Sequence, residues 1–102
     1  MSKVLFAIKY EIIEEKLIEY LDVIRELKNI VKAEGLESYR VFEVKGKKNN
    51  FEEIYYFENK EAYDNFDDDP DERVDLLMNK LSDIIKPHTT EYLTLNEVET
   101  LT

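Results

Sequence analysis

Hydrophobic residues alternate with other residues along the first dozen positions of the chain. Val4, Phe6, Ile8, Tyr10 and Ile12 occupy every second position. Because successive side chains of a strand point to opposite faces, this period predicts a first strand with one strongly apolar face.

The hydrophobic period then changes to three- and four-residue steps, which predicts a long amphipathic helix from Glu14 to Glu34. The residues on its apolar face are Ile13, Leu17, Tyr20, Leu21, Ile24, Leu27 and Val31. Gly35 follows this segment. Glycine readily adopts the left-handed conformation of a C-terminal cap, so we expect Gly35 to end the helix.

Two further alternating segments, residues 39–44 and 51–57, predict a second and a third strand. Residues 46–50 between them, Gly-Lys-Lys-Asn-Asn, include types that tolerate positive φ. A hairpin is therefore expected, with the two strands antiparallel. Residues 92–98, rich in Leu, Val and Tyr and flanked by threonines, predict a fourth strand.

Asn59 precedes Lys-Glu-Ala-Tyr at 60–63, which predicts an asparagine cap and a short helix with Ala62, Tyr63 and Phe66 turned inward. The acidic run that follows, residues 64–75, is either a metal loop or a helix start. An EF-hand pattern aligned from Asp67 fails, because its sixth position is Glu72 instead of glycine and its twelfth is Met78 instead of glutamate.

We therefore interpret the acidic run as a helix start, with weak, nonspecific divalent binding as the alternative. Asp69 suits the N-cap and Pro70 the first helical position, and carboxylates in the first turn favour the helix dipole. Apolar residues from Val74 to Ile85 continue at helical spacing, and Pro87 lies just past the predicted end.

The order strand, helix, strand, hairpin, strand, helices, strand predicts an α+β ferredoxin-like βαββαβ fold, with a four-stranded antiparallel sheet carrying its helices on one face. We expect one domain over residues 1–102, with its core at about residues 3–98. Both faces of the strands are apolar, so we expect the helix-free face to be buried against a second copy of the chain.

Composition limits the partners. The net charge of −10 disfavours nucleic acid and anionic membrane surfaces, and no apolar run approaches the length of a membrane span. The chain has no cysteine, which excludes disulfides, thiol catalysis and thiolate metal sites. With no secretory signal visible at residues 1–10, we expect a cytoplasmic protein.

Candidate chemistry rests on the seven tyrosines and the single histidine. Tyrosines of this kind fill a small core or an interface. Alternatively, two or three hydroxyls converge with Arg40 or Arg73 in the cavity, where they orient an aromatic or carboxylated ligand and hold an enolate-like oxyanion. His88 is an exposed loop residue or a general base, and one histidine cannot build a two-histidine metal site. The catalytic candidates are Tyr10, Tyr56, Tyr63 and His88, and the ligand-binding candidates are Arg40, Phe57 and Arg73; we expect no metal site.

Two stretches carry a resemblance: Gly-Leu-Glu-Ser-Tyr-Arg-Val-Phe at 35–42, and Ile-Tyr-Tyr-Phe-Glu-Asn-Lys-Glu-Ala-Tyr at 54–63. With the element order, they resemble the antibiotic biosynthesis monooxygenase-like dimeric α/β barrel family. The resemblance implies a homodimer whose sheets meet as a barrel, with a ligand cavity between sheet and helices. Members of the family are cofactor-independent oxygenases of aromatic polyketides or quinols, haem-degrading enzymes, or proteins without an assigned role.

The chain departs from this family at two points. Phe57 stands where its oxygenases and haem degraders often carry a tryptophan, and Leu77 and Met78 stand on the last helix where haem degraders place a histidine ligand. Haem degradation is therefore disfavoured and no cofactor is expected. The function predicted is cofactor-independent oxygenation of an aromatic or quinol-type small molecule in a sheet–helix cavity. The alternative is a non-catalytic homodimeric module that binds a ligand or serves only in interactions.

Overall fold

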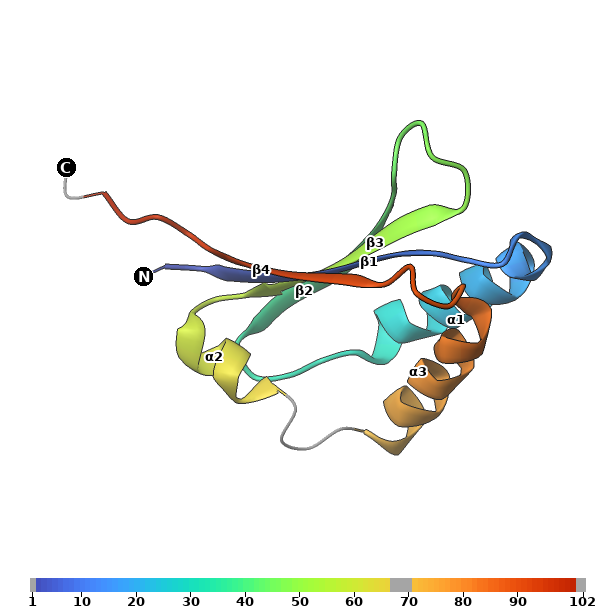
Figure 1. The fold of residues 1–102 in the computed structure, drawn as a ribbon. Coiled ribbons are helices and arrows are strands. Elements are labelled where there is room, and N and C mark those ends of the chain that lie inside the picture. The colour runs from blue at the N-terminus through green and yellow to red at the C-terminus, as the bar shows by residue number, and fades with distance from the viewer. Residues whose placement is uncertain (1, 67–70, 101–102) are drawn as a thin grey trace.

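The computed structural model describes residues 2–66 and 71–100 as a four-stranded antiparallel sheet with its helices on one face (Figure 1). The elements are β1 (Val4–Glu11), a 3-10 helix η1 (Glu14–Lys16), α1 (Leu17–Ile30), β2 (Leu36–Glu43), β3 (Asn50–Phe57), α2 (Lys60–Asp64), α3 (Glu72–Ile84) and β4 (Glu91–Asn96). The strand order is β2-β3-β1-β4, and every neighbouring pair is antiparallel. The predicted ferredoxin-like α+β fold is confirmed.

Strand register decides which residues face the helices. In β1, Tyr10 contacts Tyr20 of α1, so the residues that alternate with Tyr10 face the helices as well. Across the sheet, this helix-side face includes Val4, Phe6, Ile8, Tyr10, Tyr39, Val41, Phe51, Glu53, Tyr55, Phe57, Tyr92 and Thr94. The period-2 prediction for β1 is confirmed, because its even-numbered residues share one face.

The core lies between this face and the helices. The helices bury Tyr20, Val23, Ile24 and Leu27 of α1 and Leu77, Leu81 and Ile84 of α3. Each such side chain removed from water contributes roughly 1.5–3 kcal/mol, so these two amphipathic faces hold the helical layer on the sheet. Among residues 2–66 and 71–100, no helix is both long and apolar enough to cross a bilayer.

The first helix is shorter than predicted, because residues 14–16 form the 3-10 helix η1 and α1 begins at Leu17. The first helix ends at Ile30, because Val31 is already extended with ψ of 108°, so Gly35 is not its cap. Gly35, with φ of 81°, instead turns the chain into β2, and its carbonyl accepts a hydrogen bond from Glu58 N at 2.9 Å. The early end of α1 gives the chain the residues it needs to reach the end of β3.

The predicted cap Asp69 and first helical residue Pro70 lie outside the described residues. The helix begins at Glu72, and its N-cap is Asp71, whose carboxylate accepts a hydrogen bond from Arg73 N at 2.7 Å. The predicted cap of the short helix is confirmed, since Asn59 Oδ1 accepts from Ala62 N at 2.8 Å.

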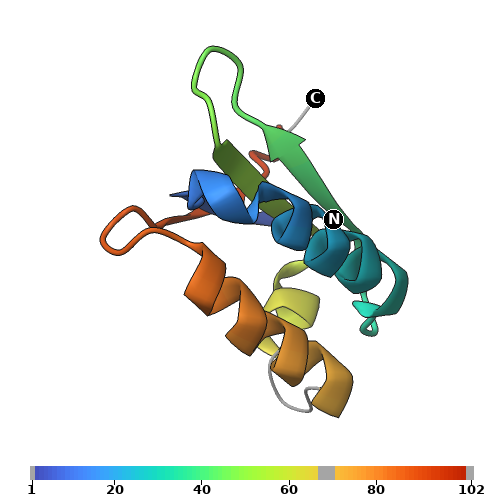
Figure 2. The same cartoon turned by 90° about the vertical axis from the view of Figure 1, so that its right-hand side faces the viewer.

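The helical layer covers the sheet unevenly. Helix α3 lies beside α1 (Figure 2), and every residue of β4 is exposed. Tyr92, which belongs to the helix-side face of β4, is 69% exposed. Space therefore remains between α3 and the β1–β4 side of the sheet.

Candidate functional site

Two adjoining cavities, of about 540 and 350 Å³, occupy this space. They share the lining residues Ile8, Met78 and Tyr92, so we treat them as one feature, the sheet–α3 groove. Its volume lies in the range of small-molecule sites. The groove lies between the sheet and the helices, where the sequence led us to expect a ligand cavity.

The larger part of the groove has an aromatic wall. Phe6 of β1 lies between Tyr55 of β3, at a ring-centroid distance of 5.9 Å, and Tyr92 of β4, at 6.1 Å with the two rings nearly parallel. Phe66 extends the wall, with its ring 5.2 Å from that of Tyr55. The ring of Tyr55 is tilted relative to that of Phe6, and the ring of Phe66 relative to that of Tyr55. Aromatic side chains that line a cavity in this way favour apolar and aromatic ligands.

The smaller part of the groove is more polar. Tyr10 of β1, Glu53 of β3 and His88 of the loop after α3 line it together with the apolar Leu81. Three segments far apart in the sequence thus bring a phenol, a carboxyl group and an imidazole to one cavity, next to the aromatic wall.

The position of His88 follows from how its loop is fastened to β1. Lys86 N donates to Glu11 O at 2.8 Å, and Thr89 Oγ1 both donates to Lys86 O at 2.8 Å and accepts from Glu11 N at 3.2 Å. Within this closed loop His88 adopts φ of 66°, an uncommon conformation for a residue other than glycine. His88 itself is exposed, as predicted for a loop histidine.

Glu53 is the centre of a buried hydrogen-bond cluster. Its Oε1 accepts a hydrogen bond from the Tyr39 hydroxyl at 2.5 Å, and Tyr10 also hydrogen-bonds its side chain. The Tyr10 and Tyr20 hydroxyls are 2.8 Å apart and hydrogen-bonded to each other. These four side chains, which we call the Glu53 cluster, come from β1, β2, β3 and α1 and meet at the inner end of the groove.

Burial raises the pKa of Glu53 above its ordinary value, while the hydrogen bonds from Tyr39 and Tyr10 oppose this shift by stabilising the carboxylate. Burial likewise raises the pKa of Tyr10, Tyr20 and Tyr39, and the nearby Glu53 adds to the effect. The raised pKa values keep the tyrosines neutral, so they act as hydrogen-bond donors, and the Glu53 carboxyl group holds its proton to a higher pH than an exposed glutamate does.

Solved structures match nearly the whole chain. A conserved protein from Methanosarcina mazei Go1 is 16% identical with a TM-score of 0.79, over 96% of this chain and 95% of that one. A point mutant of SnoaB, a cofactor-independent oxygenase from Streptomyces nogalater, matches at 15% identity and a TM-score of 0.74, over 97% and 96% of the two chains. A protein named an antibiotic biosynthesis monooxygenase is 19% identical with a TM-score of 0.68, over 98% and 99%.

The chain has the fold of the antibiotic biosynthesis monooxygenases. The resemblance noted in residues 35–42 and 54–63 is thereby supported in three dimensions. No family model matches the sequence, and no curated protein matches it. At these identities the likeness shows the fold, so function must be argued from the groove itself.

The monooxygenase fold brings some predicted site residues together and separates others. Tyr10 and His88 line the groove. Phe57 is buried in the core, with its ring 5.6 Å from that of Tyr63, and neither residue lines the groove. The Tyr63 hydroxyl is 3.2 Å from Thr94 Oγ1 and hydrogen-bonded to it.

Arg40 and Tyr56 lie on the opposite, helix-free face of the sheet, where the Arg40 guanidinium is 5.6 Å from the centre of the Tyr56 ring. Arg40 therefore does not converge with tyrosine hydroxyls in the groove, which rules out the form of the ligand-binding alternative that relied on Arg40. Arg40 directly follows Tyr39 in β2, and successive side chains of a strand point to opposite faces of the sheet.

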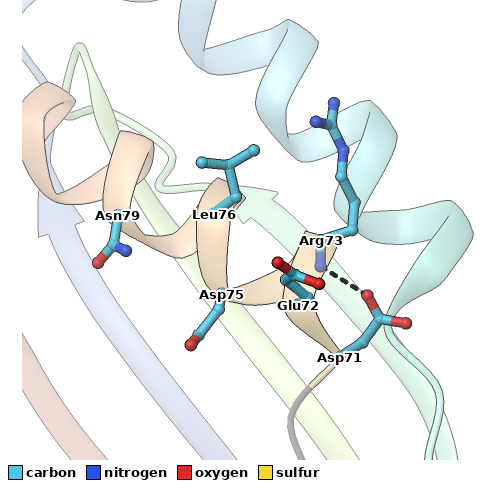
Figure 3. A pocket seen from close by; sticks show the side chains of 6 residues that line it. All are labelled: Asp71, Glu72, Arg73, Asp75, Leu76 and Asn79. Atoms are coloured by element: carbon cyan, nitrogen blue, oxygen red, sulfur yellow. Dashed lines mark hydrogen bonds between the residues drawn. The ribbon is translucent and has the colours of Figure 1, made fainter.

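Arg73 is also outside the groove. It lines a different concavity of about 690 Å³ on α3, together with Asp71, Asp75 and three other residues (Figure 3). Its side chain extends from α3 toward α1, where Nε donates to Glu26. Both partners are substantially solvent-exposed, so this ion pair contributes little to stability, and its geometry gives no reason to assign Arg73 to ligand binding.

The sequence patterns did not single out Glu53 as a site residue, nor the aromatic-wall residues Phe6, Tyr55, Phe66 and Tyr92. A signal for Glu53 exists, because Phe51, Glu53, Tyr55 and Phe57 share the apolar period of the third strand. A carboxylate at an apolar position of an alternating strand indicates either a buried functional group or a face that meets solvent.

Proposed function

We propose that the chain binds a flat aromatic small molecule in the sheet–α3 groove and oxygenates it without a cofactor. The observation that carries the proposal is the junction of the aromatic wall with a polar end that holds an ionisable carboxyl group. The match to SnoaB, named a cofactor-independent oxygenase, supports the same class of reaction.

The chemistry required of the protein is limited. An aromatic substrate with an acidic ring CH₂ loses a proton, and the resulting anion passes electrons to dioxygen. One oxygen atom then remains on the carbon as a carbonyl and the other leaves as water. The protein binds the ring and accepts the proton, and the groove has the residue types for these two tasks.

Oxygen uptake with dithranol, a tricyclic anthrone with an acidic ring CH₂, tests the proposal. Met78 lines both parts of the groove, so Met78→Trp fills their junction and is expected to abolish dithranol binding and oxygen uptake. Leu76→Trp is the matched control on the same helix, because Leu76 is exposed and does not line the groove. It should behave like the unmodified chain.

The outcomes separate the two candidate functions. Uptake of oxygen that Met78→Trp removes and Leu76→Trp keeps supports the enzyme. Binding without uptake supports the non-catalytic ligand-binding module. Binding unaffected by Met78→Trp would overturn the assignment of the groove.

We also propose that the chain forms a homodimer through the helix-free face of the sheet. The apolar residues on this face are Leu5, Ala7, Phe42, Ile54, Tyr56, Leu93 and Leu95. Phe42, Leu93 and Leu95 are among the exposed large hydrophobic residues, and contiguous apolar surfaces of this type usually mark an interface. A second copy of the same face is the partner whose shape and polarity match it most simply.

A further inference from the structure

Glu53 is the one charged residue that is fully buried in the described part of the chain, with 1% of its surface exposed. Burying an ionisable group costs free energy even when it is well hydrogen-bonded, and an apolar residue of the same size would serve packing better. A contribution to folding stability therefore does not explain why a glutamate stands at position 53. Its location at the polar end of the groove points to a role in ligand binding.

The cluster leaves Glu53 able to accept another hydrogen bond. A carboxylate offers about four acceptor positions on its two oxygens. Tyr39 donates to Oε1, and the Tyr10 hydroxyl lies close to the same carboxyl group and favours its charged form. Both tyrosines are buried and hold the carboxyl group in place, so they are positioning residues, and the remaining acceptor capacity can serve a molecule in the groove.

From this geometry we propose that Glu53 accepts the acidic proton of an aromatic ligand bound in the sheet–α3 groove. The inference rests on the proposed function, which places the ligand in the groove. What it adds is the identity of the group that accepts the proton of the ligand. The ligand class is a neutral planar molecule with an acidic O–H or ring C–H. The O–H bond of the carboxylic acid forms as the ligand bond to hydrogen breaks, and the electron pair stays on the ligand as a delocalised anion.

Proton transfer in this direction keeps the charge of the site constant, because one negative charge moves from the carboxylate to the ligand. A base is most effective when its pKa lies near the working pH, and burial moves the pKa of Glu53 in that direction. The tyrosine donors remain available to the carboxyl group in both states, since a protonated carboxyl still accepts hydrogen bonds.

Titratable side chains surround Glu53 on several elements. They include Tyr10 from β1, Tyr39 from β2, Tyr55 from β3, Tyr92 from β4, Tyr20 from α1, and His88 and Lys86 from the loop after α3. Lys86 already pairs with Glu11 at 2.8 Å. From α3 the lining is Met78, Leu81 and Ser82, none of which titrates. His88 is thus the competing proton acceptor, and the experiment must distinguish it from Glu53.

Two naphthalenes provide the test. 2-Naphthol carries an acidic hydroxyl, and 2-methoxynaphthalene has the same ring with the hydrogen replaced by methyl. We expect the unmodified chain to bind 2-naphthol about tenfold more tightly than 2-methoxynaphthalene, because only the naphthol can donate a hydrogen bond to the charged carboxylate. This preference should disappear as the pH falls through the pKa of Glu53, while the affinity for the methyl ether stays constant.

Glu53→Gln keeps the size of the side chain and can still accept from Tyr39, so it should fold, which circular dichroism verifies. It is expected to bind both naphthalenes with similar affinity at all pH values. It should also lower the rate of dithranol oxygenation about a hundredfold and remove the acid limb of its pH profile. His88→Asn should retain the preference and its pH dependence.

The outcomes distinguish this inference from the proposed function. Equal affinities of the unmodified chain for the two probes, with both bound in the groove, would overturn the role of Glu53 and leave the groove as a ligand site. Loss of the preference in His88→Asn but not in Glu53→Gln would assign the proton to the histidine and also overturn it. Failure of both probes and of dithranol to bind would overturn the groove assignment itself.

Discussion

Gly35 lies so close to Ala62 that a Cβ added to the glycine would come within 2.4 Å of the Ala62 Cβ. The contact joins the turn before β2 to helix α2, and the neighbouring hydrogen bond from Glu58 N to Gly35 O, at 2.9 Å, ties the same turn to the end of β3. Gly35 therefore meets two demands at once, a positive φ and the absence of a side chain.

Gly35→Ala is expected to destabilise the fold by more than its backbone conformation alone requires. Gly46 is the matched control, because it has nearly the same φ, 84° against 81°, and a Cβ there would meet nothing within 4 Å. Gly46→Ala should cost about 1–2 kcal/mol for the left-handed backbone, and Gly35→Ala a further 1–3 kcal/mol for overpacking. Urea unfolding of both variants measures the difference. Equal decreases in unfolding free energy would show that α2 moves to accommodate the added Cβ without loss of stability.

This contact also marks the limit of the sequence patterns. The apolar period from Ile13 to Val31 predicted α1 correctly, but it placed Gly35 at the end of that helix. Periodicity reports which face of a segment is apolar, whereas the end of α1 is decided by how the chain must approach Ala62 and Glu58, residues more than twenty positions away.

The site illustrates the same point. Tyr10 and His88 were found by residue type, because phenols and imidazoles are common functional groups. The exclusion of Arg40 from the groove follows from strand alternation and could have been predicted. The proximity of Tyr10, Glu53 and His88 could not be predicted from the sequence. It depends on the pairing of β1 with β3 and on the hydrogen bonds that hold the loop after α3 to Glu11.

The buried Glu53 should make folding stability depend on pH in an unusual direction. Its pKa is raised above the ordinary value of 4.5 in the folded state, so the folded chain binds more protons than the unfolded chain between the two pKa values. Stability contributed by this group is therefore present below pH 4.5 and is lost as the pH rises through the folded pKa.

The comparison that isolates this effect is the difference in unfolding free energy between the unmodified chain and Glu53→Gln, measured by urea denaturation from pH 4 to pH 8. Surface carboxylates titrate in both proteins and cancel. The difference is expected to move in favour of Glu53→Gln as the pH rises. A constant difference across this range would mean that Glu53 has the same pKa in the folded and unfolded chains.

Removing one tyrosine hydroxyl should show how strongly the cluster holds Glu53. Tyr39→Phe deletes the 2.5 Å hydrogen bond to Glu53 Oε1 and leaves that oxygen buried, which is expected to cost about 1.5–3 kcal/mol. Because this hydrogen bond lowers the pKa of Glu53, its loss should raise that pKa further.

Tyr63→Phe is the matched control for Tyr39→Phe. It removes a hydroxyl of the same kind whose 3.2 Å hydrogen bond to Thr94 is exposed, where water can replace the lost partner. Its effect on the unfolding free energy should be within about 0.5 kcal/mol of zero. Thermal unfolding of the two variants at one pH measures both, and similar losses would contradict a special role for the bond to Glu53.

The helix-free face predicts the state of assembly and the residues that control it. Leu93 is 54% exposed at the centre of β4 on this face, next to Ala7 of β1, and a lysine there would leave a charge inside a dimer interface. Ile18 of α1 is the control, since it is 77% exposed on the helical side of the molecule, away from this face. The substitutions Leu93→Lys and Ile18→Lys change the net charge by the same amount, so general electrostatic repulsion cannot separate them. In sedimentation velocity at micromolar concentration, the unmodified chain and Ile18→Lys are expected to be dimers and Leu93→Lys a folded monomer.

An unmodified chain that sediments as a monomer of 12.2 kDa would contradict the proposed homodimer. A dimer that persists in Leu93→Lys would show that the interface lies on another surface.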